Sequence, residues 1–434
     1  MNTYWPQLEA LCAAGTLAAI DLHFARFVAR LDGRDDPAVA LGASVVSQMA
    51  AAGHVCADLR TVAGQPIITP DGDTPPVPIA PALAPWIAAL RASGVVGRPG
   101  EVRPLVLDDV GRLYLHRLWE DERRVADALL ARADFAPALD RDRLRADLAQ
   151  LFPGTSLDRP DWQRVAAAVA VLRRFCVIAG GPGTGKTSTV VRVLVLLARQ
   201  QPAPLRVELA APTGKAASRL LDAIQRAAGH LPAKLGAALA LPTEARTLHR
   251  LLGRPPRHGE LSPLVSADVV VVDEASMVDL SLMARLVRAL PSTTRLILLG
   301  DKDQLASVEA GAVLADVCGP AAGCSAGLAA SLTELLGETV PAAALAVSAP
   351  LQDSIVVLRH SHRFGPDSGI GRLADAVNAG AADTARQLLI DAAFTDVQWL
   401  PTHTPRELAD RLDAAVTAYA AFATAVPAGA APAE

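Results

Sequence analysis

Four continuous apolar runs mark the middle of the chain. Their sequences are FCVIAG, RVELAAP, DVVVVDE and RLILLGD, and they begin at Phe175, Arg206, Asp268 and Arg295. Each run is rich in β-branched residues or leucine, which is typical of strands in a parallel sheet covered on both faces. Because helix-like segments separate the runs, residues 158–318 predict a doubly wound α/β sheet. The carboxyl ends of its strands would share one edge, where such sheets bind ligands.

Helical spacing dominates the residues before this sheet. Residues 1–110 predict a small helical N-terminal domain. Within it, Pro37 marks a helix start, apolar residues follow at helical spacing, and Gly53 marks the helix end. Residues 111–157 predict a strand-like piece followed by connecting amphipathic helices.

The residues after the sheet are less regular. Residues 319–350 have low complexity and predict a poorly ordered loop with one or two helical turns. The apolar run within residues 354–364 predicts the opening strand of a second α/β unit, which would occupy residues 351–434. From residue 419 onwards the chain is rich in alanine and proline without a periodic apolar face, so we expect a frayed tail.

A glycine-rich stretch, GGPGTGKT, joins the first apolar run to a helix-like segment. It fits the pattern G-x-x-x-x-G-K-[ST], whose glycines let backbone N–H groups surround a phosphate chain at the positive end of a helix. Lys186 would reach the β- and γ-phosphates, and the Thr187 hydroxyl would bind Mg²⁺. The other nucleotide-binding positions are Gly180, Gly181, Pro182, Gly183, Thr184 and Gly185. The alternative is a chance glycine turn.

Lysine is scarce, with four lysines against 37 arginines. Lysine is a compact point charge and arginine a wide planar fork, so a retained lysine indicates a position that needs an ammonium group. Lys186, Lys215 and Lys302 all follow predicted strands at the same sheet edge, which argues against chance survival. The formal net charge of -4 excludes a polybasic binder, so any nucleic-acid contact would come from a local basic surface.

The cysteines and the apolar segments bear on the compartment. The five cysteines show no CxxC spacing and no histidines at metal-ligand distances, a pattern that fits buried thiols in a reducing cytoplasm. The sequence has no uninterrupted apolar stretch of about 18 residues and no basic segment followed by an apolar one at its start. We therefore expect a soluble, cytoplasmic protein.

Carboxylates follow two of the predicted strands. Asp273 and Glu274 come directly after four valines. Asp273 suits the shell of Mg²⁺, and Glu274 can orient and polarise an attacking water, a role that a kinase would not need. A helix N-cap pair is the alternative. Asp301 and Gln304, after the last strand, are placed to sense a γ-phosphate.

The order of these motifs resembles a known family. The segments GGPGTGKT, APTGKAASRL, TLHRLLG, VVDEASMVD, LLGDKDQL and SHRF occur in the order found in superfamily 1 DNA helicases of the 5′-to-3′ polarity group. They are most similar to the RecD family, the alpha subunits of exodeoxyribonuclease V. Residues 23–59 and 111–132 are similar to the family's N-terminal domain, which contacts the RecC subunit. The resemblance covers roughly residues 8–400.

The resemblance implies a function and partners. It implies a RecA-like P-loop ATPase lobe over residues 158–318 and a second RecA-like lobe after it. The implied activity is ATP- and Mg²⁺-dependent 5′-to-3′ unwinding of DNA in recombinational double-strand-break repair. RecB-like and RecC-like subunits and single- and double-stranded DNA ends would be the partners.

Further roles come from the resemblance residue by residue. Gln163 would contact the adenine, Gln304 would couple the nucleotide to DNA, and Arg363 would be an arginine finger from the second lobe. The positions that resemble DNA-facing residues are Pro212, Thr213, Lys215, Thr247 and His249. The alternatives are exposed polar positions for Gln163 and Arg363 and a structural role for His249.

The chain departs from the family after Arg363. No second arginine and no HKSQG-like segment follow, so the second lobe is expected to be truncated. One alternative is therefore a catalytically impaired subunit that acts as an interaction module. A P-loop kinase or an unrelated ATPase is disfavoured by Asp273 and Glu274 and by the motif order.

Overall fold

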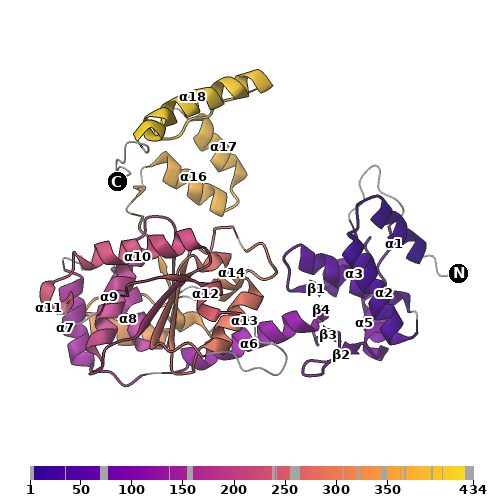
Figure 1. The fold of residues 1–434 in the computed structure, drawn as a ribbon, viewed down its shortest axis with the longest axis horizontal. Helices are drawn as coiled ribbons and strands as arrows, with labels where there is room; N and C mark the ends of the chain where they lie inside the picture. Colours follow the sequence, from indigo (N-terminus) through magenta and orange to yellow (C-terminus); the bar gives the residue numbers. More distant parts are fainter. Residues whose placement is uncertain are drawn as a thin grey trace. The chain divides into compact units, whose positions relative to one another are not determined.

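The chain divides into two compact units, Met1–Ser361 and His362–Glu434. The computed structural model describes residues 4–34, 36–68, 77–135, 137–153, 160–236, 240, 242–254, 264–305, 307–319, 323–343, 349–361, 363–365, 368–391, 394–402 and 404–425. Figure 1 shows the elements of both units along the chain.

A parallel sheet forms the centre of the first unit. Its strand order is β10-β5-β9-β8-β6-β7, and all five neighbouring pairs are parallel. The strands are β5 (Phe175–Gly180), β6 (Val207–Ala211), β7 (Arg246–Thr247), β8 (Val269–Val272), β9 (Arg295–Gly300) and β10 (Ile355–Leu358). The four predicted apolar runs are therefore confirmed as β5, β6, β8 and β9, with their carboxyl ends at one edge.

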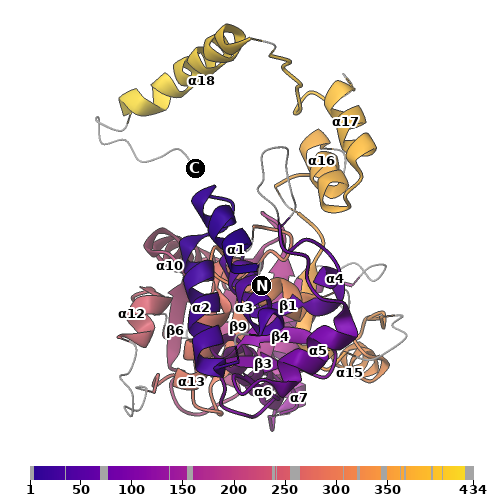
Figure 2. The ribbon, with the colours of Figure 1, turned by 90° about the vertical axis from the view of Figure 1, so that its right-hand side faces the viewer.

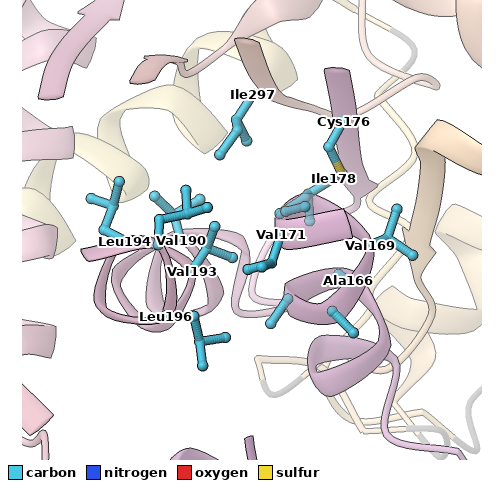
Figure 3. Packing of buried hydrophobic residues seen from close by; sticks show 14 of the residues in the cluster. Ala166, Val169, Val171, Cys176, Ile178, Val190, Val193, Leu194, Leu196 and Ile297 are labelled. Atoms are coloured by element: carbon cyan, nitrogen blue, oxygen red, sulfur yellow. The ribbon is translucent and has the colours of Figure 1, made fainter. Parts of the chain in front are cut away.

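Helices cover both faces of this sheet. On one face lie α7 (Arg141–Leu151), α8 (Trp162–Leu172), α9 (Lys186–Arg199), α10 (Gly214–Ala228), α11 (Ala233–Gly236) and α15 (Ala326–Leu336). Figure 3 shows part of this cluster, in which Cys176 and Ile178 of β5 pack with Val190 of α9. On the other face lie α6 (His116–Ala133), α12 (Leu248–Leu252), α13 (Leu280–Ala289) and α14 (Val313–Cys318). Alternate strand residues thus point into two separate cores.

The strand β10 corrects the predicted domain boundary. Residues 354–364 were expected to open a second α/β unit, but Ile355–Leu358 pair in parallel with β5, with Val356 opposite Ile178. The prediction is wrong because an apolar run shows that a strand is buried without showing which sheet it joins. The first unit therefore extends to Ser361.

The helix α15 corrects the predicted loop over residues 319–350. Ser325 caps it by accepting a hydrogen bond from the Leu328 N–H, and Gly337 ends it in a left-handed conformation at φ 71°. Leu332 and Leu335 are fully buried in the core on the α8 face. Leucines at positions i, i+4 and i+7 carried the helical signal, and the alanine-rich composition around them obscured it. Residues 320–322 and 344–348 of the predicted loop lie outside the described residues.

The N-terminal domain contains a sheet as well as helices. Its helices are α1 (Tyr4–Ala13), α2 (Ala19–Asp32), α3 (Pro37–Ala51), α4 (Leu59–Val62) and α5 (Leu83–Ala92). The sheet has the order β1-β4-β3-β2, formed by β1 (Cys56–Asp58), β2 (Val96–Gly97), β3 (Leu105–Leu107) and β4 (Arg112–Leu115). Helix α3 packs on α2, α5 and this sheet (Figure 2). Because β4 completes the sheet, the domain reaches Leu115, beyond the predicted boundary at residue 110.

The described part of the second unit contains three helices and no strand. They are α16 (Gly369–Asn378), α17 (Ala382–Ile390) and α18 (Pro405–Ala425). The frayed tail expected from residue 419 is wrong for residues 419–425, which belong to α18, because alanine favours the helix. Residues 426–434 lie outside the described part of the chain.

The predicted burial of the thiols is confirmed for three of the five, since Cys12 and Cys56 are half-buried. All five cysteines are free, and Cys176, Cys318 and Cys324 are buried. Burial raises the pKa of Cys176 to about 12. Among the described residues, no helix is both long and apolar enough to cross a membrane.

Candidate nucleotide-binding site

The loop between β5 and α9 adopts the conformation that its glycines allow. Gly183 and Gly185 have φ angles of 77° and 83°, in the left-handed region that residues with a Cβ rarely enter. Gly185 is also the N-cap of α9, so the loop leads directly into the first turn of that helix at Lys186 and Thr187. This backbone directs the positive end of a buried helix toward the carboxyl edge of the sheet.

Gly180 is required by close packing. A Cβ at this position would lie 2.7 Å from Thr184 Oγ1 and 3.0 Å from the carbonyl oxygen of Leu358 in β10. Thr184 Oγ1 in turn donates a 2.9 Å hydrogen bond to the carbonyl oxygen of Gly181. Ser361 Oγ donates to the carbonyl oxygen of Pro182 at 3.0 Å, so the end of the first unit also supports the loop.

Lys186 lies over the loop that precedes it. Its Nζ donates hydrogen bonds to the carbonyl oxygens of Gly180 and Gly181. A triphosphate in the loop would offer charged oxygens to the same ammonium group, and hydrogen bonds between two charged groups are the stronger ones. The glycine cradle, the helix end and this ammonium therefore fit a phosphate chain.

Asp273 and Glu274 lie at the end of β8, close to the loop. Burial raises the pKa of Asp273, the backbone N–H of Glu274 lowers it, and Lys186 is close enough to lower it as well. Among the described residues, Glu274 is the one non-glycine with a positive φ, at 51°. A left-handed conformation costs such a residue about 1–2 kcal/mol, and strain of this kind is concentrated at functional sites.

The N-cap alternative for this pair is wrong. The short helix η1 (Ala275–Met277) follows Glu274 without any side-chain cap. The next helix, α13, is capped instead by Asp279, which accepts a hydrogen bond from the Leu282 N–H. Helix capping therefore does not explain why Asp273 and Glu274 lie at this position.

The end of β9 lies next to the same loop. Asp301 is buried, and its Oδ2 lies 3.9 Å from the Cβ position built on Gly181. Gln304 is exposed, and its backbone N–H donates to the carbonyl oxygen of Asp301 at 3.3 Å. Lys302 Nζ bonds Asp303 at 2.6 Å. The predicted sensor residues thus share the sheet edge with Lys186.

Gln163 contacts the loop directly. It lies in the first turn of α8, where Asp161 accepts hydrogen bonds from the backbone N–H groups of Gln163 and Arg164. Its Nε2 donates to the carbonyl oxygen of Thr184 at 3.1 Å, and its Oε1 accepts from Arg192 at 3.2 Å. The alternative of an exposed polar position is therefore wrong. Arg192 was missed because its contact with Gln163 depends on the packing of α9 against α8.

The positions that resemble DNA-facing residues lie at the ends of β6 and β7. Thr213 and Thr247 cap α10 and α12, accepting hydrogen bonds from the N–H groups of Ala216 and Arg250. The two strands pair there, with Ala211 opposite Thr247. The remaining positions are Pro212, which is half-buried, and Lys215 and His249, which are exposed.

Two exposed arginines, Arg219 and Arg363, complete the set of candidate residues. Arg219 is exposed one helical turn after Lys215 in α10, and sequence analysis did not select it because arginine is common throughout the chain. Arg363 belongs to the second unit and is exposed there. The described residues contain no group of three or more His, Cys, Asp or Glu side chains that could hold a metal ion.

Comparison with known proteins identifies two domains. The model of the RecBCD enzyme subunit RecD N-terminal domain matches residues 13–114, and the model of an AAA domain matches residues 163–310. The first match ends one residue before the end of β4, and the second contains the loop, β8 and β9.

Curated relatives extend the match. RecBCD enzyme subunit RecD of Mycolicibacterium smegmatis is 40% identical over 91% of this chain and 63% of its own length. The ATP-dependent RecD2 DNA helicase of Deinococcus radiodurans is 41% identical over 32% of this chain and 17% of its own length. A solved Pif1 helicase from Bacteroides, in complex with ADP-AlF3 and ssDNA, is 17% identical over 60% of this chain and 57% of its own, with a TM-score of 0.28, too low to support any conclusion.

The chain spans about three fifths of the length of its mycobacterial relative. Its two matched domains occur in the order of a RecD subunit, and the similarity to such a subunit covers nine tenths of its residues. Over most of its length the chain is therefore similar to the RecD subunits of RecBCD enzymes.

Proposed function

We propose that this chain is an ATP-dependent 5′-to-3′ DNA helicase subunit of an exodeoxyribonuclease V complex, acting in recombinational double-strand-break repair. The observation that carries the proposal is a glycine loop whose Lys186 lies over its carbonyl oxygens and is close enough to a strand-end carboxylate, Asp273, to lower the pKa of that carboxylate. A phosphate-binding lysine next to a magnesium-type carboxylate is the minimum that triphosphate hydrolysis needs.

Each residue of the site has a role in this proposal. The N–H groups of residues 180–187 and the Lys186 ammonium bind the phosphates, and Thr187 and Asp273 would hold Mg²⁺, which would neutralise phosphate charge. Glu274 follows β8 and has a left-handed backbone conformation. Its carboxylate accepts a hydrogen bond from the attacking water and orients this water toward the γ-phosphorus.

Two residues link hydrolysis to movement. Gln304 senses the γ-phosphate at the end of β9, next to Asp301. Arg363 would act as the arginine finger that the resemblance implies, stabilising charge on the transferring phosphoryl group. Different DNA affinities of the nucleotide-bound and nucleotide-free states would then drive translocation.

DNA would run over the edge formed by β6, β7 and the helices that follow them. Lys215 and Arg219 are exposed one turn apart on α10, and His249 is exposed on α12. Ammonium and guanidinium groups in a row bind a phosphate backbone without regard to sequence. The backbone N–H groups near Pro212, Thr213 and Thr247 would add contacts at two helix starts.

The proposed partners follow from the similarity to RecD subunits. RecD is named as a RecBCD enzyme subunit, so we infer RecB-like and RecC-like subunits and DNA ends as partners. The N-terminal domain, residues 4–115, is the part that we expect to dock on the RecC-like subunit.

Nucleotide-dependent DNA binding tests this proposal. Fluorescence anisotropy of a labelled single-stranded oligonucleotide measures the affinity of the chain for DNA. This affinity should change when a non-hydrolysable ATP analogue replaces ADP. Lys215→Ala should weaken binding and lower the salt slope by about one unit, because one phosphate contact is lost. Lys234→Ala is the matched control, since Lys234 is exposed on α11, away from the strand ends. Equal losses in both variants, or no effect of nucleotide, would contradict the proposed DNA path.

A further inference from the structure

A buried ion pair joins the first turn of α8 to the second residue after α15. Arg164 Nη1 lies 3.6 Å from Glu338 Oε1, and the exposed fractions of the two side chains are 10% and 3%. Glu338 lies in the segment that the sequence predicted to be a poorly ordered loop. The pair therefore links two parts of the chain that are far apart in sequence.

The pair is an unfavourable way to stabilise a core. Within the described residues, Arg164 Nε and Glu338 Oε1 have no hydrogen-bond partner. Burial raises the pKa of Glu338, although Arg164 and the backbone N–H of Asp161 both lower it. Removing two charges from water costs several kcal/mol for each ion, and apolar residues of similar size are often as stable or more so. A role in geometry explains the pair better than a role in stability.

The geometry concerned is that of Gln163. The backbone N–H of Asp161 is close enough to Glu338 to lower the pKa of its carboxyl group, and Asp161 caps the N–H groups of Gln163 and Arg164. Glu338 thus lies against the turn of α8 that carries Gln163, paired with Arg164 on one side and near Asp161 on the other. The other contacts of Gln163, with Thr184 and Arg192, come from the phosphate loop and α9.

Glu338 is itself held rigidly. Leu332 and Leu335 anchor α15 in the core, and Gly337, at φ 71°, turns the chain so that the next residue enters the interior. The N–H of Val340 then donates to Thr333 Oγ1 at 3.0 Å. A carboxylate that is held in this way can fix the position of the turn that it contacts.

We propose that Glu338 and Arg164 are positioning residues for base recognition, which fix the first turn of α8 so that the Gln163 amide faces the nucleotide base. This inference rests on the proposed binding of ATP by the loop of residues 180–187. An amide that donates and accepts together matches N7 and the N6 amino group of adenine, whereas guanine presents two acceptors there. The orientation of Gln163 therefore sets the preference for ATP over GTP.

A double-mutant cycle on the full chain tests the inference. Calorimetry gives the affinities of Mg-ATP, Mg-GTP and inorganic tripolyphosphate for the wild type, Gln163→Ala, Glu338→Gln and the double variant. Each single substitution should lower the ATP-over-GTP preference on the order of tenfold, because a misplaced binding group loses its contact. The double variant should lose no more than Gln163→Ala alone, and tripolyphosphate affinity should stay unchanged.

Matched variants separate positioning from folding. Glu334→Gln makes the same chemical change at an exposed position of α15 and should leave every affinity as in the wild type. Arg164→Met combined with Glu338→Met removes both charges without leaving one buried alone, so it should fold while still losing ATP preference. If that double variant keeps the preference, or if Glu338→Gln lowers all three affinities equally, the pair is merely structural.

The outcome also separates this inference from the proposed function. A wild type that binds ATP and GTP equally, and loses both in Lys186→Gln, would overturn base positioning while leaving the phosphate site intact. A wild type that binds neither nucleotide nor tripolyphosphate would overturn both.

Discussion

At the scale of single residues, the phosphate loop depends on the missing side chain of Gly180. A methyl group there would meet Thr184 Oγ1 and, more seriously, the backbone oxygen of Leu358, which cannot rotate away. Gly180 joins the loop to β10, because it pairs with Leu358, which lies 178 positions later in the chain. A substitution of Gly180 should therefore disturb both the conformation of the loop and the packing of the sheet.

The substitution Gly180→Ala should lower the free energy of unfolding by about 1–3 kcal/mol, the usual cost of overpacking. Urea unfolding followed by circular dichroism measures the change. Gly214→Ala is the matched control, because a Cβ at Gly214 meets nothing within 4 Å. It should change stability by at most about 1 kcal/mol, in the stabilising direction. Similar losses in the two variants would show that strand β10 does not pack on the loop as described.

The sequence revealed some site residues and hid others. Lys186 could be found from the fixed spacing of the glycine-rich motif, and Asp273 from the buried strand that precedes it. Arg192 and Glu338 could not, because their roles depend on tertiary contacts with the turn that carries Gln163. Glu274 could be selected for its charge, while its left-handed backbone was visible only in the structure.

At the scale of elements, α15 and β10 show what patterning leaves undecided. Both were read as irregular or as part of another unit, and both belong to the core around β5. The apolar pattern of β6, β8 and β9 sufficed to place them in one sheet because helices of ordinary length separate them. The pairing partner of β10 is set by tertiary packing, for which a single sequence carries no signal.

Leu332→Ala tests whether α15 belongs to the core. Leu332 is fully buried, so its truncation should lower the free energy of unfolding by about 2–5 kcal/mol. Leu305→Ala is the matched control, since Leu305 is 92% exposed and should change stability by less than about 0.5 kcal/mol. If thermal and urea unfolding of Leu332→Ala matched the wild type, residues 326–336 would not be the core helix described above.

At the scale of the whole molecule, the N-terminal domain, the ATPase sheet and the second unit carry different shares of the proposed activity. The first unit contains every described residue that we assign to phosphate, Mg²⁺ and DNA, and Arg363 alone comes from the second. The similarity to a RecD subunit spans both the N-terminal domain and the ATPase sheet, and the four apolar runs predicted that sheet from the sequence. In the N-terminal domain, the strand-like piece predicted near residue 112 is β4, whereas β1, β2 and β3 were missed because they are only two or three residues long.

The Mg²⁺-dependent ATPase rate of the full chain, with and without single-stranded DNA, decides whether this site hydrolyses ATP. We predict a rate that DNA stimulates and that Lys186→Gln abolishes. Glu274→Gln should retain ATP binding while losing about 10²–10⁴-fold in turnover, because only water activation is removed. The exposed Glu309→Gln should behave as the wild type. A folded wild type that turns over no ATP, or a rate that survives Lys186→Gln, would contradict the account.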